Sequence, residues 1–127
     1  MNTRTKGRLN ENKVRAKYTE NGYLTYRPPS TKYGEQDIFG LWDLLIFDGH
    51  FTKLIQVKSN MSDASRFKKK SEKWLNKYCL EPDSVEPNYM FWYELFVVLP
   101  KGKIRKFTWN HFYMKWEENK DESKFYE

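Results

Sequence analysis

The chain has 127 residues, which allows one hydrophobic core, so we expect a single domain spanning residues 1-127. Its 23 basic and 17 acidic residues give a formal net charge of +6, which favours a polyanionic partner. A lone cysteine, Cys79, excludes a disulfide framework, and no stretch approaches the roughly 20 apolar residues of a membrane span. These properties predict a soluble, cytoplasmic protein.

The first predicted element is a helix from about Arg8 to Asn21, preceded by a flexible basic arm at residues 1-7. Its thin apolar stripe consists of Val14 and Tyr18. Glu11 lies three residues before Val14, so its carboxylate points along the stripe toward the interior. Such an acid is either a buried hydrogen-bonding group or a site residue.

A short strand is expected over Tyr23 to Arg27, because Pro28 and Pro29 stop it. Residues 30–41 then read as a long loop, and loops of this length in small domains are often functional. Asp37, in this loop, is a second acid near the polar hairpin that follows in the chain, and it is interpreted as a loop or capping residue.

Two apolar runs, Asp43 to Phe47 and Thr52 to Lys58, flank Asp48-Gly49 and predict a β-hairpin. With a loop of two to four residues, Asp43 lies opposite a residue between Leu54 and Gln56. Because side chains alternate along a strand, Gln56 and Lys58 share one face. A carboxylate, an amide oxygen and an ammonium are therefore expected on one patch, either as a chemical site or as a polar edge on a solvated hairpin.

The second half predicts a helix, two strands and a last helix. The first helix runs from about Ser62, a plausible N-cap, to Leu80, with one apolar face that includes Trp74 and Tyr78. Strands over Tyr89 to Leu99 and Lys103 to Thr108 precede a helix capped by Asn110, and residues 120-127 read as a frayed tail. This order predicts an α/β fold with a mixed sheet flanked by helices.

Lysine and arginine gather in three clusters, each of which taken alone is either a solvated face or a binding surface. Three clusters around one polar hairpin favour nucleic acid. The side chains expected to contact it are Arg8, Lys13, Arg27, Lys32, Arg66, Lys68, Lys69 and Lys70.

The spacing of Asp43, twelve intervening residues and Gln56-Val57-Lys58 resembles the signature of PD-(D/E)xK nucleases. The preceding segment resembles the opening of archaeal Holliday junction resolvases, in which a helix carries an active-site glutamate. The positions that carry this second likeness are Gly7, Glu11, Val14, Gly22-Tyr23 and Arg27. Ser30 falls where that family keeps a loop serine near the site, and the resemblance covers residues 7–60.

The resemblance implies a restriction-endonuclease-like αβββαβ core with an extra C-terminal strand and helix. It implies a homodimeric endonuclease that cuts branched or duplex DNA, with the last strand and helix as a candidate dimer surface. Mg²⁺, or Mn²⁺ as a substitute, is the implied cofactor. The implied catalytic residues are Glu11, Ser30, Asp43, Gln56 and Lys58, and the implied metal ligands are Asp43, Gln56, the Val57 carbonyl and Glu11.

Two positions depart from the family pattern. Trp42 stands where a proline is usual, and Gln56 stands where the second acid is usual. A glutamine removes one negative charge and weakens Mg²⁺ binding. Certain Mrr-like restriction enzymes and the DNA-cleaving subunit of some transposons are similar in carrying Gln-x-Lys. The alternatives are therefore a restriction-like, nicking or single-strand nuclease of a virus or mobile element, or a nucleic-acid-binding domain that does not cut.

Overall fold

The computed structural model describes residues 3–29, 37–78 and 91–127. Two helices and six strands follow one another along these residues. They are α1 (Thr3–Glu20), β1 (Leu24–Tyr26), β2 (Leu44–Phe47), β3 (Thr52–Lys58), α2 (Met61–Tyr78), β4 (Phe91–Val98), β5 (Ile104–Asn110) and β6 (Lys115–Asn119). Two short 3₁₀ turns add Pro100–Gly102 and Glu122–Lys124.

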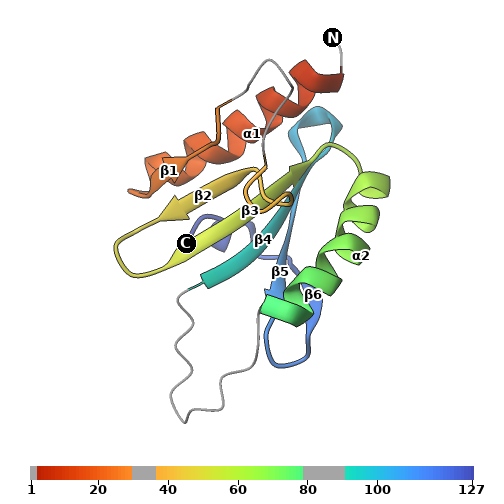
Figure 1. Ribbon diagram of the computed structural model, residues 1–127. Helices are drawn as coiled ribbons and strands as arrows, with labels where there is room; N and C mark the ends of the chain where they lie inside the picture. The colour runs from red at the N-terminus through yellow and green to blue at the C-terminus, as the bar shows by residue number, and fades with distance from the viewer. Residues whose placement is uncertain (1–2, 30–36, 79–90) are drawn as a thin grey trace.

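The strands form one six-stranded sheet in the order β1-β2-β3-β4-β5-β6. The pairing of β3 with β4 is parallel and every other pairing is antiparallel. The two helices flank this sheet, with α2 linking the parallel pair (Figure 1). The predicted α/β class with a mixed sheet is confirmed. No described helix is long and apolar enough to cross a bilayer.

The two central strands are buried on both faces, so successive residues enter different cores. Leu54 and Leu95 belong to the cluster that contains Phe67 of α2. Ile55 and Phe96 belong to the cluster that contains the helix α1 side chains Val14 and Tyr18. The thin stripe expected on α1 therefore covers part of its face of the sheet.

The central hairpin follows the predicted turn. Gly49 takes φ +103°, and the Asp48 carboxylate accepts the main-chain N–H groups of His50 and Phe51 at 2.8 and 2.7 Å. Leu44 pairs with Ile55, and continuing this register places Asp43 opposite Gln56. The chemical residues of the hairpin thus meet where the sequence predicts.

Both helices begin at other residues than expected. Helix α1 starts at Thr3 and includes residues 3–7, which were expected to be a flexible arm, because extending a formed helix costs little. Helix α2 is capped by Asn60 rather than Ser62. The Asn60 side chain accepts the Asp63 N–H at 2.8 Å, and its amide donates to the Asp63 carboxylate at 3.0 Å.

The predicted last helix is wrong. The Asn110 side chain accepts the N–H groups of Phe112 and Tyr113 at 2.9 and 3.0 Å, which closes a turn into strand β6. Trp116 of β6 pairs with Trp109 of β5, with ring centroids 5.7 Å apart. An asparagine that accepts two following N–H groups serves a helix start or a turn equally well, and packing of the partly buried Trp116 ring against the core decides for the turn. A dimer surface built on a last helix is thereby excluded.

The C-terminal tail is packed rather than frayed. Phe125 is buried against the α1 face of the sheet, and the Tyr126 ring stacks on Phe96 with centroids 5.5 Å apart. The Lys106 ammonium also donates to the Phe125 carbonyl at 2.6 Å. Residues 120–127 therefore complete the second core.

Candidate active site

Asp43 lies immediately before β2, half-buried, at the end of the hairpin far from its turn. Its main-chain N–H donates to the Ile55 carbonyl at 2.8 Å, which holds the backbone in register with β3. Its carboxylate accepts the N–H of Val57 at 3.0 Å. The side chain is therefore fixed over β3.

Gln56 faces this carboxylate and is 4% exposed. Its amide nitrogen donates to the Leu41 carbonyl at 2.6 Å, and its amide oxygen accepts the Val57 N–H at 2.9 Å. Because a carbonyl can only accept, Leu41 dictates which end of the amide is nitrogen. The Gln56 oxygen and an Asp43 oxygen thus share one N–H donor and lie together.

Helix α1 brings Glu11 to the same place. Glu11 is 7% exposed and forms an ion pair with Arg27, whose Nε lies 3.1 Å from its Oε2. One residue earlier, the Asn10 amide donates to the Ser59 hydroxyl at 2.7 Å. This bond fastens α1 to the residue that follows Lys58, so the helix acid and the strand lysine belong to one region.

The pKa of Asp43 depends on these neighbouring groups. Burial raises the pKa of Asp43 to about 8, with the carboxylates of Glu11 and then Asp37 adding to the effect. The hydrogen bond from Val57 and the ammonium of Lys58 oppose it. At neutral pH the carboxyl is therefore most stable when it holds a proton or a cation.

A cavity of about 180 Å³ lies beside these groups. Gln56 and Lys58 line it from β3, while Arg66 and Lys70 line it from α2. Asp37, which the sequence suggested as a loop or capping residue, is also part of the lining. Its main-chain carbonyl accepts the Gly40 N–H at 3.1 Å, so it has a loop role and a place at the site.

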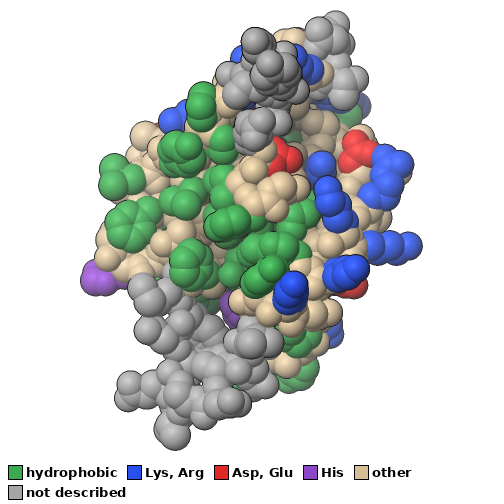
Figure 2. Space-filling view, in the orientation of Figure 1, with side chains coloured by type: hydrophobic (Ala, Val, Ile, Leu, Met, Phe, Trp, Pro, Cys, Tyr) green, Lys and Arg blue, Asp and Glu red, His purple; other side chains and the backbone are tan. Residues whose placement is uncertain are grey.

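The expected nucleic-acid contacts divide into two groups. Arg8, Lys13, Arg66, Lys69 and Lys70 are exposed, and Figure 2 shows Lys and Arg side chains gathered along α2 beside an apolar surface. The others are engaged elsewhere or lie outside the described residues.

Among the second group, Arg27 pairs with Glu11, and the Lys68 ammonium lies 3.4 Å from the centroid of the Phe107 ring. Burial lowers the pKa of Lys68. Lys32, like the proposed site residue Ser30, lies outside the described residues. Arg66 also forms an ion pair with Asp63 on the same helix.

The donor set suits a hard divalent cation. In residues 3–29, 37–78 and 91–127, no three His, Cys, Asp or Glu side chains form a metal-binding group by themselves. An ion at this site would therefore use the Asp43 carboxylate, the Gln56 amide oxygen and a main-chain carbonyl. Mg²⁺ accepts such oxygens and commonly completes its shell with water and substrate phosphate. The residues present fit Mg²⁺.

Comparison with protein-family models finds no match, and comparison with curated proteins finds no significant match.

Proposed function

We propose that this chain is a metal-dependent endodeoxyribonuclease that hydrolyses phosphodiester bonds. One observation carries the proposal: the Asp43 carboxylate and the Gln56 amide oxygen converge on the Val57 N–H, beside Lys58 and close to Glu11. Basic residues of α2 line the adjoining cavity. The element order also agrees with a restriction-endonuclease-like αβββαβ core extended by two strands.

In this proposal Asp43, Gln56, the Val57 carbonyl and Glu11 hold Mg²⁺, directly or through water. The bound ion would lower the pKa of water and neutralise charge on the phosphate oxygens. Lys58 orients the attacking water and stabilises the negative charge that builds on phosphorus. Hydrolysis adds the water hydroxyl to phosphorus, breaks one P–O ester bond and leaves the water proton on the departing oxygen.

The particular substrate class follows from the resemblance of the first helix and strand to archaeal resolvases, which makes a four-way DNA junction the first substrate to test. Recognition of a junction is a reading of shape through phosphates, and the exposed basic residues of α1 and α2 support it only in general.

A second candidate is DNA binding without cleavage. The observation that favours it is the ion pair between Glu11 and Arg27 at 3.1 Å, because a carboxylate engaged by a guanidinium is a poorer metal ligand. In this case Asp43 and Lys58 would contribute only to folding and phosphate contact.

The test is a cleavage panel in Mg²⁺ or Mn²⁺ that compares a four-way junction, a linear duplex, a flap and a single strand. Asp43→Asn and Lys58→Ala should each lower the cleavage rate by about 10³-fold or more. The exposed changes Glu122→Gln and Lys120→Ala serve as controls with matched charge loss and should leave the rate within twofold.

Paired symmetric nicks confined to the junction support a resolvase, and cutting of every duplex supports a less selective nuclease. DNA binding with no cutting in either metal, unchanged by Asp43→Asn, supports the second candidate and contradicts the proposed hydrolysis.

A further inference from the structure

A second groove, of about 360 Å³, lies next to the candidate active site on the α2 side. We call it the aromatic–lysine groove. It is defined by three aromatic residues and three lysines, namely Phe39, Trp74, Tyr78, Lys70, Lys73 and Lys77. Phe39 comes from the loop before β2, and the other five come from the second half of α2.

The aromatic rings form a platform anchored in the core. Trp74 packs against buried Trp42 and Tyr93, with ring centroids 5.9 and 5.8 Å apart. Phe39 stacks on Trp74 at 5.9 Å, and Tyr78 lies against Trp74 at 5.1 Å. Phe39 and Tyr78 are nevertheless 70% and 58% exposed, so each presents an open ring face to solvent.

Phe39 is held in an unfavourable backbone conformation. It has φ +55°, which is rare for a bulky residue and costs about 1–3 kcal/mol. Two main-chain hydrogen bonds fix the turn. The Ile38 N–H donates to the Trp42 carbonyl at 2.8 Å, and the Trp42 N–H donates to the Ile38 carbonyl at 3.0 Å. The turn thereby holds the Phe39 ring against Trp74 while leaving it 70% exposed.

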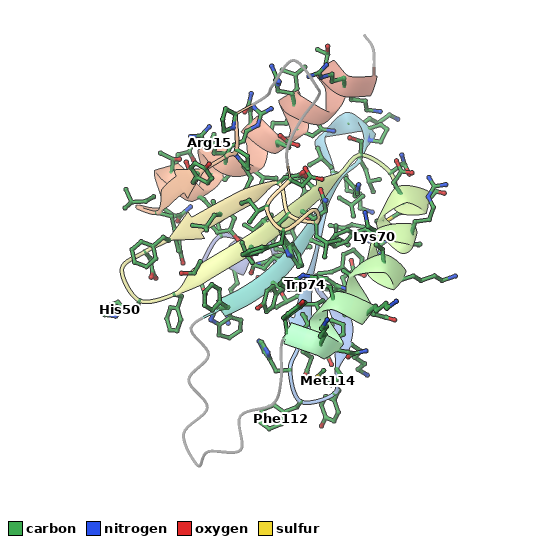
Figure 3. All side chains as sticks on the ribbon, in the orientation of Figure 1. Arg15, His50, Lys70, Trp74, Phe112 and Met114 are labelled. Atoms are coloured by element: carbon green, nitrogen blue, oxygen red, sulfur yellow. The ribbon has the colours of Figure 1, made fainter. Side chains whose placement is uncertain are left out.

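The charge of the groove is of one sign. Lys70, Lys73 and Lys77 are all exposed along the helix. No acidic side chain is among the described residues that line the groove. Figure 3 shows Lys70 and Trp74 on the stretch of α2 that runs alongside the sheet. A ligand for this surface combines negative charge with flat, stackable rings.

The groove is continuous with the candidate active site. Gly40, Leu41 and Lys70 line both it and the cavity that contains Gln56 and Lys58. The Leu41 carbonyl is also the acceptor that orients the Gln56 amide. A chain that occupies the groove therefore runs directly to the polar site.

We infer that the aromatic–lysine groove binds unpaired nucleotides of the DNA strand that is cut. Exposed bases stack on Phe39 and Tyr78, while Lys70, Lys73 and Lys77 contact the phosphates, as in proteins that bind single strands through stacking platforms and basic tracks. Paired bases are stacked within a duplex and cannot use the ring faces. The inference rests on the proposed function for the position of the scissile bond, and it predicts that single-stranded or flapped DNA is cut faster than a fully paired junction.

The test measures binding of the full chain carrying Asp43→Asn, in a chelator, to a fluorescent single strand of thymidines and to a blunt duplex by anisotropy. Phe39→Ala and Tyr78→Ala should each weaken single-strand binding by about 10-fold and duplex binding by less than 3-fold. Phe39→Tyr should restore single-strand binding. Replacing Lys73 and Lys77 by glutamine should lower the slope of log affinity against log salt by about 0.7 for each phosphate that the variant no longer neutralises.

Phe112→Ala and Tyr113→Ala are matched controls, because these rings are 66% and 72% exposed in the turn between β5 and β6. Both should leave either affinity unchanged. Equal loss of single-strand and duplex binding in Phe39→Ala would overturn the inference, because it would reduce the groove to a phosphate surface. Self-association that Phe39→Ala abolishes without changing DNA affinity would overturn it in favour of a contact between copies of the chain.

The inference about the groove and the proposed nuclease activity can be contradicted independently. Single-strand binding that depends on Phe39, with no cleavage of any substrate, supports the groove and contradicts the nuclease. Cleavage that depends on Asp43 but is indifferent to Phe39 and to unpaired nucleotides supports the nuclease and contradicts the groove.

Discussion

Two clusters of charged side chains next to the central strands show what distinguishes a structural cluster from a chemical one. The first is on the α1 side, where Glu94 is 2% exposed. Its carboxylate lies 2.8 Å from the Lys106 ammonium and 3.4 Å from the Lys53 ammonium, and it accepts the Tyr18 hydroxyl. Every charge in it meets an opposite charge, and main-chain oxygens of the C-terminal tail accept from both lysines.

The second cluster brings like charges together. The carboxylates of Glu11 and Asp37 both raise the pKa of Asp43, although Glu11 is also paired with Arg27. Asp37, Gln56 and Lys58 line the cavity beside this cluster. The difference teaches that burial by itself does not mark a site. A buried carboxyl whose pKa is raised by neighbouring acids is stabilised by a proton or a cation, and a cavity beside it leaves room for one, which is the pattern that favours chemistry.

The largest expected effect comes from breaking the cluster around Glu94. Glu94→Gln leaves two buried lysines without their carboxylate and should lower the free energy of unfolding by about 3–5 kcal/mol in urea titrations. Glu118→Gln is the control, because Glu118 forms an ion pair with Arg105 at 2.7 Å near the surface and should lose less than about 1 kcal/mol. Equal losses in the two variants would contradict the distinction.

The next largest effect tests whether the C-terminal tail stabilises the fold on the side of the sheet that holds Glu94. Phe125 is 5% exposed, and Phe125→Ala should lower the free energy of unfolding by about 3 kcal/mol. Phe112→Ala removes the same ring from an exposed turn and should change it by less than about 0.5 kcal/mol. A Phe125→Ala chain as stable as the unchanged one would show that the tail is dispensable.

In the cluster around Asp43, removing a charge should raise the free energy of unfolding, whereas in the cluster around Glu94 it should lower it. The pKa of Asp43 is about 8 in the folded chain and 3.8 as an ordinary aspartate, so the folded state binds the extra proton between these values. In a chelator, stability should therefore fall as pH rises from about 4 to about 8. Asp43→Asn should flatten this slope and stabilise the chain by about 1 kcal/mol at pH 8, as substitutions at strained active sites often do.

Asp48, at the other end of β2, is the matched control for this measurement. Main-chain N–H groups of Phe51 and His50 lower its pKa, so its contribution to stability is present above the ordinary value and is lost as pH falls. Asp48→Asn should therefore destabilise the chain at neutral pH. Parallel behaviour of the two variants at pH 8 would contradict the assigned environments.

The smallest expected effect tests the role of Gln56. Gln56→Glu places a carboxylate oxygen against the Leu41 carbonyl, now 2.6 Å from the amide nitrogen, and adds a third acid near Asp43 besides Glu11 and Asp37. The variant should lose about 1 kcal/mol of stability in chelator and bind Mg²⁺ more tightly, seen as a larger Mg²⁺-induced rise in melting temperature. A variant whose melting temperature ignores Mg²⁺ would argue against a metal at this position.

Much of the candidate site was predictable from local patterns. The Asp48-Gly49 turn sets the hairpin register, which places Asp43 opposite Gln56, and helical spacing turns Glu11 inward. Asp37 was predicted to lie near the site but was interpreted as a loop residue, and Phe39 was not recognised as part of the site region, because a loop has no period from which to read direction. Tyr78 was assigned to the buried face of its helix, yet it is exposed near the end of α2.

The sequence by itself determined the element order as far as β5, the burial of β4 on both faces and the positions of the hairpin residues, because strand alternation and turn chemistry act over a few residues. Only the tertiary structure decided three other features: the strand after Asn110, the packed tail and the aromatic–lysine groove beside the polar site. Each depends on contacts between residues far apart in the chain, such as Trp116 with Trp42 or Phe39 with Trp74. Local preference cannot specify such contacts, since burial against a distant partner outweighs it.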